Sequence, residues 1–430
     1  MPEDAALVTD LYELTMTAAY RRLGMDGTAT FELFVRRLPD QRNFLVACGI
    51  EPAVEYLEHL RFTAGDIDYL RTLAMFDEDF LASLAELRFT GEVWAVPEGE
   101  VVFAEEPLMR VTAPLPEAQL VETFLLATIT FETMIASKAA RVAIACGPDR
   151  TFVDFSGRRD HGPAAAVEAA RAAFVGGAAA TSNVEAGRRW GVPLNGTMAH
   201  SYVLSFADEH AAFSCYARTF PDRAVFLIDT YDTEQGARIA AAVAKEVEAE
   251  GISVRGVRLD SGDLESLSRS VRVILDEAGC RDIQIFASND LDEHRIAALG
   301  AEGAPIDGFG VGTMLGTSAD APYLSGVYKL VEDQTGGKAK LSSGKRSWPG
   351  RKQVYRQADR DVIAVVGEDP PPAGTPLLSR FMAGGRRTRP SEDLSAARQR
   401  CRDAVAALPP ALRDLQKRAH HPVERVGQGS

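Results

Sequence analysis

A single histidine, His200, stands in a segment whose residue types suit phosphoryl chemistry, Gly196-Thr197-Met198-Ala199-His200-Ser201. A neutral imidazole can take a phosphoryl group from ATP and later release it, which divides one difficult step into two. Two other interpretations stay open. A lone histidine is usually packed in a core, and as a metal ligand this one lacks neighbours at a suitable spacing.

Two further segments suit a sugar phosphate and its metal ion. Asp260 and Asp263, in the segment 258–263, can accept hydrogen bonds from ribose hydroxyls or share Mg²⁺ with a diphosphate. In Gly310-Val311-Gly312-Thr313, the glycines let backbone N–H groups approach an anion and the threonine adds a hydroxyl donor. Alone this glycine pattern is a weak indication, but the seventh strand of a barrel is a usual phosphate position.

Cationic and aromatic side chains complete the candidate set. Arg258, Arg158 and Arg159 offer guanidinium forks for phosphate or carboxylate. Phe155 either stacks on a flat ring or packs in the core. Tyr12 lies off the apolar stripe of its predicted helix, so it forms either a lid over a planar ligand or a partly packed surface residue.

An alternation of short apolar strands and helices must position these groups. We predict strands at residues 151–154, 176–181, 194–197, 224–228, 254–259, 283–287 and 308–311, with a candidate eighth at 326–331. Repeated strand-helix units indicate a parallel sheet with helices outside. Because no Gly-rich dinucleotide turn follows the first strand, the predicted fold class is α/β, a parallel α/β barrel.

The residues that end these strands are expected to meet on one face of the barrel. They are polar in all seven cases, at 154–159, 181–183, 197–201, 229–233, 258–263, 288–290 and 310–313. Helix capping explains Ser261, Asn289 and Asp232 individually as well as a site does, but it does not explain the whole ring.

Both chain ends are expected to build a smaller α+β domain, from residues 1–115 and about 357–430, around a barrel domain at 116–356. The expected N-terminal helices span about 7–22, 51–60, 66–73 and 78–87, with Thr9 or Asp10 capping the first and Thr63 capping the third. A long helix over 117–145 carries Lys138 and Arg141 one turn apart. These two could meet a phosphate, although such charges are more often solvated.

Composition indicates a soluble globular enzyme, with 46% hydrophobic and 25% charged residues in 430. The net charge of −14 disfavours a non-specific nucleic-acid binder, while local arginines still permit anionic small substrates. Five scattered cysteines without a CxxC pair favour reduced thiols and disfavour structural zinc. An acidic N-terminus and the lack of a membrane-length apolar run predict a cytoplasmic protein that uses no membrane.

Taken in order, these segments resemble those of nicotinate phosphoribosyltransferases, a type II phosphoribosyltransferase family. The resemblance runs through 9–16, 31–36, 196–201, 227–233, 256–264, 288–293, 310–313 and 349–356 to the C-terminal helices. It implies a barrel with a domain built from both chain ends, assembled as a homodimer with sites near the subunit interface. The implied reaction, in NAD biosynthesis, joins nicotinate to 5-phosphoribosyl 1-diphosphate with Mg²⁺ present and couples ATP hydrolysis through a phosphohistidine.

The resemblance also assigns roles to individual residues. His200 matches the phosphohistidine, Tyr12 and Phe155 the aromatic sandwich for the pyridine ring, Thr197 and Arg258 the nicotinate contacts, and Thr313 a phosphoribosyl diphosphate contact. We further expect Arg158 and Ser182 at the substrate, and Arg159, Lys138, Ser288, Asn289, Gly310 and Gly312 at the phosphates. The chain departs from the family pattern at two points. The family commonly has Phe-Gly-X-Arg-Arg where this sequence has Phe155-Ser156-Gly157-Arg158-Arg159, and Trp348 precedes Pro349 where a smaller polar residue is expected.

Three alternatives are weighed against this hypothesis. The nicotinamide-specific relative carries an aspartate where Ser182 stands, and a site without that carboxylate should prefer nicotinate because like charges repel in a desolvated pocket. A catalytically silent barrel that senses nucleotides would not need the full polar ring. A barrel aldolase or isomerase would want a Schiff-base lysine or paired bases, and no strand end carries a lysine.

Overall fold

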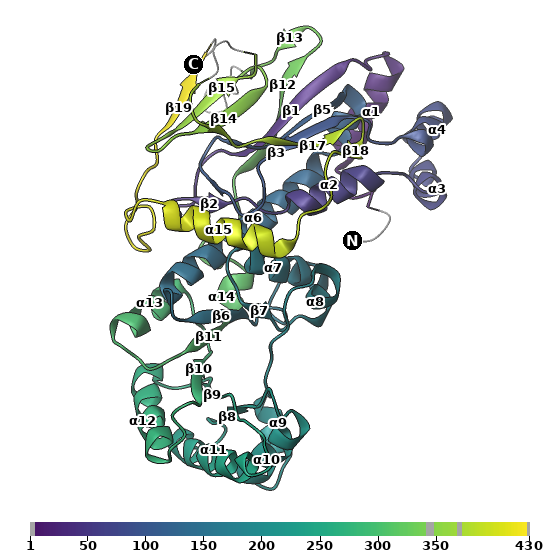
Figure 1. Cartoon of the computed structure of the whole chain (residues 1–430). Coiled ribbons are helices and arrows are strands. Elements are labelled where there is room, and N and C mark those ends of the chain that lie inside the picture. The colour runs from purple at the N-terminus through teal and green to yellow at the C-terminus, as the bar shows by residue number, and fades with distance from the viewer. Residues whose placement is uncertain (1–4, 341–347, 368–371, 428–430) are drawn as a thin grey trace. The chain divides into compact units, whose positions relative to one another are not determined.

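The computed structural model describes residues 5–340, 348–367 and 372–427, and the chain divides into two compact units. Unit 1 comprises Met1–Ser137 and Tyr323–Ser430, and unit 2 comprises Lys138–Pro322. The colour ramp of Figure 1 shows both chain ends in the same unit, which consists of the purple and the yellow-green segments.

Unit 2 begins later and ends earlier than the barrel domain expected at 116–356. Unit 1, which is built from both chain ends, is correspondingly larger than expected. Helix α6 (Glu122–Cys146) begins in unit 1, where Phe124, Leu125 and Ile129 join the core. Strand β12 (Gly326–Asp333), the candidate eighth barrel strand, instead pairs antiparallel with β1 (Thr28–Val35). That part of the prediction is wrong, because a strand's apolar pattern does not reveal which sheet it joins.

Unit 1 is built on a seven-stranded antiparallel sheet of order β13-β12-β1-β5-β3-β17-β18. A four-stranded sheet of order β16-β14-β15-β19 and the pair β2-β4 complete it. The remaining strands are β2 (Leu45–Val46), β3 (Glu92–Ala95), β4 (Val101–Val102), β5 (Pro107–Pro114), β13 (Gly336–Gly337), β14 (Lys352–Arg356), β15 (Asp361–Val365), β16 (Thr375–Pro376), β17 (Ser379–Ala383), β18 (Arg386–Arg387) and β19 (Val423–Val426).

The helices of unit 1 begin near the positions that the sequence predicts. They are α1 (Leu11–Arg22), α2 (Ile50–His59), α3 (Ala64–Thr72), α4 (Glu78–Glu86), α5 (Leu115–Leu120) and α15 (Leu394–Ala407). Thr63 caps α3 in a reciprocal capping box with Asp66. Asp10 occupies the N-cap position of α1, as expected, but makes no side-chain cap bond. The Thr9 hydroxyl donates to the Glu13 carboxylate and the Leu120 carbonyl.

Unit 2 contains a six-stranded parallel sheet that curls into part of a barrel, in the order β7-β6-β11-β10-β9-β8. The last sequential strand, β11, lies beside the first, β6, as closure of a barrel requires. The strands are β6 (Thr151–Asp154), β7 (Ala180–Thr181), β8 (Val225–Leu227), β9 (Gly256–Leu259), β10 (Gln284–Ala287) and β11 (Gly308–Val311).

The predicted strand at 194–197 forms only an isolated parallel bridge, from Leu194 to Thr181. Pro193, Asn195 and Gly196 surround this leucine, and such residues pair poorly in a sheet interior. The segment that leads to His200 is therefore a loop rather than a barrel strand.

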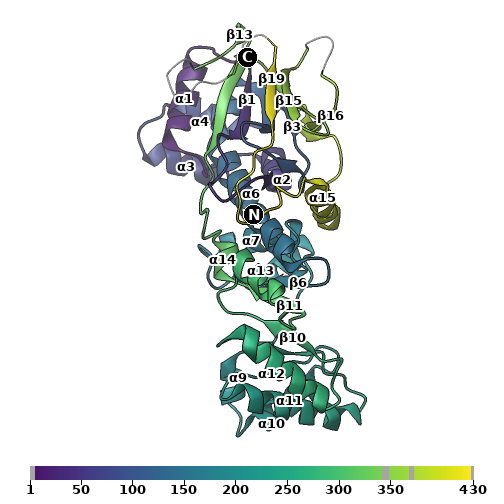
Figure 2. The ribbon, with the colours of Figure 1, turned by 90° about the vertical axis from the view of Figure 1, so that its left-hand side faces the viewer.

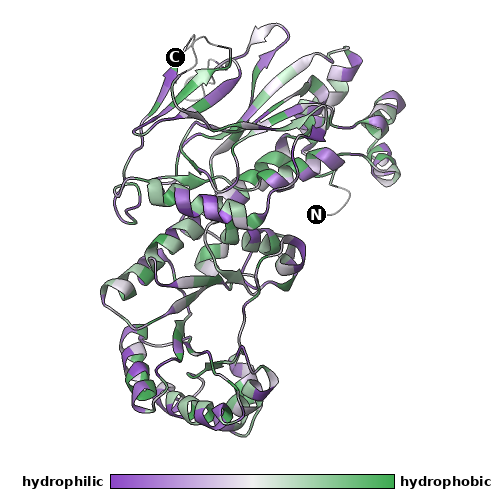
Figure 3. Cartoon of the chain, in the orientation of Figure 1, coloured by the Kyte–Doolittle hydropathy of each residue, from purple (hydrophilic) through white to green (hydrophobic). Residues whose placement is uncertain are grey.

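Helices cover the parallel sheet and place their apolar sides against it (Figures 1 and 3). They are α7 (Pro163–Val175), α8 (Val184–Trp190), α9 (His200–Leu204), α10 (Glu209–Thr219), α11 (Thr233–Glu248), α12 (Leu264–Glu277), α13 (Glu293–Ala301) and α14 (Thr313–Gly316). Figure 2 shows α11 and α12 side by side, and the Phe213 ring of α10 stacks on Phe226 of β8 at 4.7 Å between centroids. Within the described ranges, every helix is too short or too polar to cross a membrane.

Candidate active site

His200 begins helix α9, and its ring faces polar groups from two neighbouring strand ends. The Nδ1 atom lies 3.1 Å from the Thr230 hydroxyl. The Nε2 atom lies 3.7 Å from a carboxylate oxygen of Asp260 and 3.9 Å from one of Asp229. Because the imidazole is 40% exposed and faces carboxylates rather than hydrocarbon, the packed-core interpretation of this histidine does not hold.

Asp229 organises the carboxylates around this ring. Its side chain is 1% exposed, and its Oδ2 accepts the backbone N–H of Asp260 at 2.8 Å and the Ser261 hydroxyl at 2.6 Å. Its Oδ1 is buried without a hydrogen-bond partner in the described part of the chain. The sequence predicts a polar strand end at 229–233, but no individual role for Asp229 or Thr230. The sequence feature that points to both residues is their position just after the buried strand β8.

Asp260 and Asp263 lie in different surroundings, although only two residues separate them. The Ser288 hydroxyl donates to Asp260, and Ser288 is itself only 4% exposed. Asp263 caps helix α12 by accepting the N–H of Glu265 at 3.3 Å. The structure therefore brings Asp260 to His200, whereas Asp263 serves the helix terminus and Ser288 holds a carboxylate.

The turn after β10 holds two non-glycine residues in the left-handed region, Asn289 at φ 93° and Asp290 at φ 43°. The cap of α13 is Asp292, which accepts the N–H of Arg295, so Asn289 is not needed for capping. Consecutive strained residues cost free energy and are typical of functional loops.

Arg258 ties the end of β9 to the loop that precedes His200. Its Nη2 donates to the Met198 carbonyl at 2.9 Å, and its guanidinium lies 6.0 Å from the centre of the Phe155 ring. Its Nε is buried without a hydrogen-bond partner among the described residues. Burial lowers the pKa of Arg258 and the neighbouring Arg158 lowers it further, whereas the carboxylates of Asp260 and Asp229 raise it. A half-buried guanidinium whose Nε has no partner can donate to a further anion.

Three other predicted substrate residues lie around the same strand ends. The Thr197 hydroxyl is 3.3 Å from the Met198 carbonyl. Ser182 is exposed and donates its backbone N–H to the Asp154 carbonyl at 3.0 Å. Arg159 is exposed in the loop after β6. Within the described ranges, none of these three side chains takes part in a buried ion pair.

The end of β11 and the residue that follows it pack tightly against Phe155. A Cβ atom built on Gly310 would lie 2.5 Å from the Phe155 ring, and one built on Gly312 would lie 3.4 Å from the Phe155 carbonyl oxygen. Thr313, which follows, is exposed. Glycine is thus required at position 310 by packing, independently of any phosphate.

The expectation that Lys138 meets a phosphate is not supported by its surroundings. Lys138 is 1% exposed, contacts the buried Glu293 carboxylate and lies 2.8 Å from Asp320. Arg141 donates to the same Glu293 at 2.8 Å. Although burial opposes ionisation, the two cations lower the pKa of Glu293. The four side chains form a buried ionic cluster inside unit 2.

Tyr12 belongs to unit 1, on helix α1, and its side chain is 46% exposed. Burial of the hydroxyl end, followed by repulsion from Glu122, raises the pKa of this tyrosine. Val8 and Leu11 are comparably exposed beside it, at 48% and 49%. The N-terminal end of α1 therefore presents an apolar surface with an aromatic ring.

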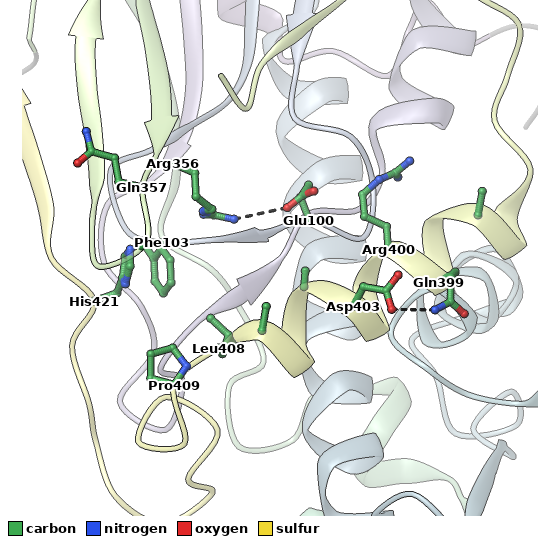
Figure 4. A pocket seen from close by; sticks show the side chains of 14 residues that line it. Glu100, Phe103, Arg356, Gln357, Gln399, Arg400, Asp403, Leu408, Pro409 and His421 are labelled. Atoms are coloured by element: carbon green, nitrogen blue, oxygen red, sulfur yellow. Dashed lines mark hydrogen bonds and ion pairs between the residues drawn. The ribbon is translucent and has the colours of Figure 1, made fainter. Parts of the chain in front are cut away.

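Other clusters of ionisable groups belong to unit 1. Cys48, Glu98 and Glu132 are buried close together, and each has further polar partners. A cavity of about 680 Å³ lies between α15 and the ends of β4 and β14. Figure 4 shows Arg356 paired with Glu100, and Gln399 with Asp403, along its walls. These groups come from elements other than the strand ends that carry His200 and Asp260.

Comparisons with known proteins agree on one family. A model of the nicotinate phosphoribosyltransferase (NAPRTase) N-terminal domain matches residues 7–130. The nicotinate phosphoribosyltransferase pncB2 of Mycobacterium tuberculosis is 49% identical over 417 residues, covering 96% of this chain and 89% of that protein. The nicotinate phosphoribosyltransferase of Bacillus subtilis is 49% identical over 381 residues, covering 85% and 77%.

Solved structures extend this agreement to the fold. The crystal structure of human nicotinic acid phosphoribosyltransferase matches with a TM-score of 0.87 at 29% identity, over 98% of each chain. A nicotinate-nucleotide pyrophosphorylase from Pyrococcus furiosus matches with a TM-score of 0.77 at 23% identity, covering 94% of this chain and 95% of that one, and shares the fold.

Proposed function

This chain belongs to the nicotinate phosphoribosyltransferase family, and we propose that it joins nicotinate to 5-phosphoribosyl 1-diphosphate with ATP coupled through a phosphorylated His200. The products are nicotinate mononucleotide, diphosphate, ADP and phosphate, and one water is consumed. The observation that carries the proposal is the exposed His200 ring, with Nε2 facing Asp260 and Asp229 at the strand ends that also hold Arg258.

Nicotinate binding rests on Arg258 and Phe155. The half-buried guanidinium lacks a partner at Nε and can donate to the nicotinate carboxylate, while the neighbouring Arg158 adds positive charge. Phe155 offers a ring face to the pyridine, and Thr197 and Ser182 offer hydroxyls nearby. Since Ser182 brings no negative charge to the pocket, the carboxylate of nicotinate is preferred over the amide of nicotinamide.

The carboxylates at the ends of β8 and β9 fit Mg²⁺. Asp229 has a buried oxygen without a hydrogen-bond partner among the described residues, and Asp260 is close by, an oxygen donor set of the kind this ion uses together with waters. When bound, Mg²⁺ would neutralise charge on the diphosphate. Asp263 contributes less directly, because its carboxylate already caps α12.

His200 acts as a nucleophile toward ATP. A ring nitrogen attacks the γ-phosphorus, the bond to the β-phosphate oxygen breaks, and ADP leaves. Thr230 holds the ring through Nδ1, which fixes its orientation and leaves Nε2 toward the carboxylates. Water later attacks the phosphoryl group and releases phosphate, and the energy of that cleavage drives nucleotide formation forward.

In the transfer itself, the bond from C1 of the ribose to the diphosphate breaks while the pyridine nitrogen bonds to C1 from the opposite face. The ribose passes through an oxocarbenium-like centre and the leaving diphosphate gains charge. Arg158 and Arg159, both exposed after β6, supply positive charge for this group. Thr313, Gly310 and Gly312, and the strained turn at Asn289, supply donors for the phosphates.

A homodimer in the cytoplasm completes the proposal. Tyr12 is exposed beside Val8 and Leu11, so a second copy could cover this surface and use the ring against a bound pyridine. In this arrangement Phe155 stacks on one face of the pyridine ring, and Tyr12 of α1 stacks on the other.

A product assay tests the proposed function. Purified protein is incubated with 5-phosphoribosyl 1-diphosphate, Mg²⁺ and either nicotinate or nicotinamide, with and without ATP. Nicotinate mononucleotide should accumulate, and ATP should raise the yield at equilibrium. Equal or faster turnover of nicotinamide would contradict the assigned substrate, and a yield independent of ATP would contradict the coupling.

A further inference from the structure

Two segments of the proposed site touch each other at three points. The loop after β6 carries Phe155 and Arg158, and the second segment runs from Gly310, in β11, through Gly312 to Gly316, the last residue of α14. Gly310 packs under the Phe155 ring and Gly312 under its carbonyl. The third contact lies at the end of α14, where a Cβ atom built on Gly316 would lie 1.9 Å from Asp160 Oδ1 and 2.4 Å from Ser156 Cβ. The two segments therefore fit together with no room for a methyl group at the last contact.

The side chain of Ser156 is fully engaged in the loop after β6. The residue is 0% exposed, its backbone N–H donates to Asp154 at 2.9 Å, and its hydroxyl donates to Asp160 Oδ2 at 3.0 Å. Asp154 also accepts the Thr181 hydroxyl at 2.7 Å, so the chain of hydrogen bonds reaches the second strand end. The other Asp160 oxygen is buried without a hydrogen-bond partner among the described residues and abuts Gly316.

We propose that Ser156 and Asp160 are positioning residues that lock the loop after β6 to helix α14, which follows β11, so that the pyridine support and the phosphate-binding segment 310–313 keep one spacing. The proposal rests on the proposed function, which assigns nicotinate to the loop after β6 and the phosphoribosyl phosphate to the segment 310–313. The Ser156 side chain and the missing side chain of Gly316 complement each other across the contact. Because this contact holds the two segments at one spacing, a ligand bound to either segment should favour the arrangement that binds the other.

The test measures thermodynamic coupling between two inert ligands. The dissociation constant of nicotinate is determined by calorimetry, without and with saturating ribose 5-phosphate, which carries the phosphate but no leaving group. In the wild type, ribose 5-phosphate should lower the dissociation constant of nicotinate about five- to tenfold, within the usual range of such couplings. In Ser156→Ala and Asp160→Ala the factor should fall below about two, with each ligand alone still binding within about threefold of wild type.

Conservative variants separate positioning from general damage. Asp160→Asn keeps an oxygen that accepts the Ser156 hydroxyl and should retain the coupling. Asp307→Asn is the matched control, because Asp307 also accepts a hydrogen bond in unit 2, from the Ile285 N–H, but lies just before β11 and not in the loop after β6. Should Asp160→Ala fail to fold, Ser156→Ala carries the test, since it removes one oxygen.

Each outcome is decisive. Wild-type protein that binds neither ligand would refute the proposed function itself. Wild-type protein that binds both ligands without coupling, or Ser156→Ala and Asp160→Ala variants with the wild-type factor, would overturn the positioning role and leave the proposed function standing. Loss of coupling in Asp307→Asn would likewise overturn the specific role of the Ser156–Asp160 contact.

Discussion

Asp229 accepts the backbone N–H of Asp260 at 2.8 Å, so the carboxylate at the end of β8 fixes the backbone from which the next carboxylate projects. Both side chains then face Nε2 of His200. The proposed phosphorylation site thus depends on two adjacent strand ends. A substitution of either aspartate should change the electrostatic surroundings of the imidazole.

Replacement of Asp229 by asparagine should lower kcat by about 100-fold, because it removes a preorganised charge beside His200 while keeping the size of the side chain. Steady-state kinetics with saturating ATP measure the change. Asp232→Asn provides the control on the same loop, since asparagine also caps α11 well and Asp232 has no assigned role at the histidine. Equal losses in both variants would argue against the role of Asp229.

Arg258→Lys should raise KM for nicotinate by about 10- to 100-fold, the loss expected when a charged hydrogen bond to a carboxylate is removed. The KM for 5-phosphoribosyl 1-diphosphate should change much less. Because lysine keeps the positive charge but not the planar fork, the variant tests geometry and not charge alone. A larger rise in KM for 5-phosphoribosyl 1-diphosphate than for nicotinate would show that Arg258 binds the phosphate substrate and not the nicotinate carboxylate.

Lys138→Met distinguishes a structural lysine from a phosphate ligand. Removal of the cation leaves Glu293 and Asp320 without it in a buried cluster, so the free energy of unfolding should fall by about 3–5 kcal/mol. Denaturant titration measures this, with Lys245→Met on an exposed face of α11 as the control. An unchanged free energy of unfolding together with a raised KM for the phosphate substrate would instead support the prediction that Lys138 meets a phosphate.

Asp160→Asn should make the protein more stable at neutral pH. Burial, partly opposed by the Ser156 hydroxyl, raises the pKa of Asp160 to about 6 from an ordinary 3.8, with Asp154 raising it and His161 lowering it. A raised carboxyl pKa means that stability is fully present below about pH 3.8 and is lost as the pH rises through about 6. Asparagine cannot ionise.

Thermal unfolding from pH 4 to pH 8 checks this expectation. The midpoint of Asp160→Asn should exceed that of the wild type by an amount that grows between pH 4 and pH 7 and then levels off. A difference that does not vary with pH would show that the carboxylate is not destabilising. The expected pattern would mean that ionisation of Asp160 lowers the stability of the folded protein at neutral pH.

The sequence predicts those parts of the fold and site that depend on local pattern. The apolar strand β9 and the polar residues at its end place Arg258 and Asp260 at one edge of the parallel sheet, whereas His200 reaches Asp260 from a loop and the start of α9. A local sequence pattern does not predict which residues far apart in the chain will contact each other. Lys138 is separated by about 150 residues from Glu293, so its burial in an ion pair could not be foreseen.

Other departures have equally physical causes. The alternation in β12 is the same whether it joins a barrel or an antiparallel sheet, and only its register against β1 decides. The segment around Leu194 contains apolar residues, but Pro193 and Gly196 prevent extended pairing. Asp229 lacks a recognisable motif of its own, and its importance comes from the two donors that Asp260 and Ser261 bring to it.

The most direct test of the account is incubation of the protein with Mg²⁺ and ATP labelled in the γ-phosphate, followed by analysis of the label on the protein. The account predicts an acid-labile, base-stable label on wild-type protein that maps to the peptide containing His200, is absent from His200→Ala and is discharged when both substrates are added. No acid-labile label on the wild type, or undiminished label on His200→Ala, would contradict it.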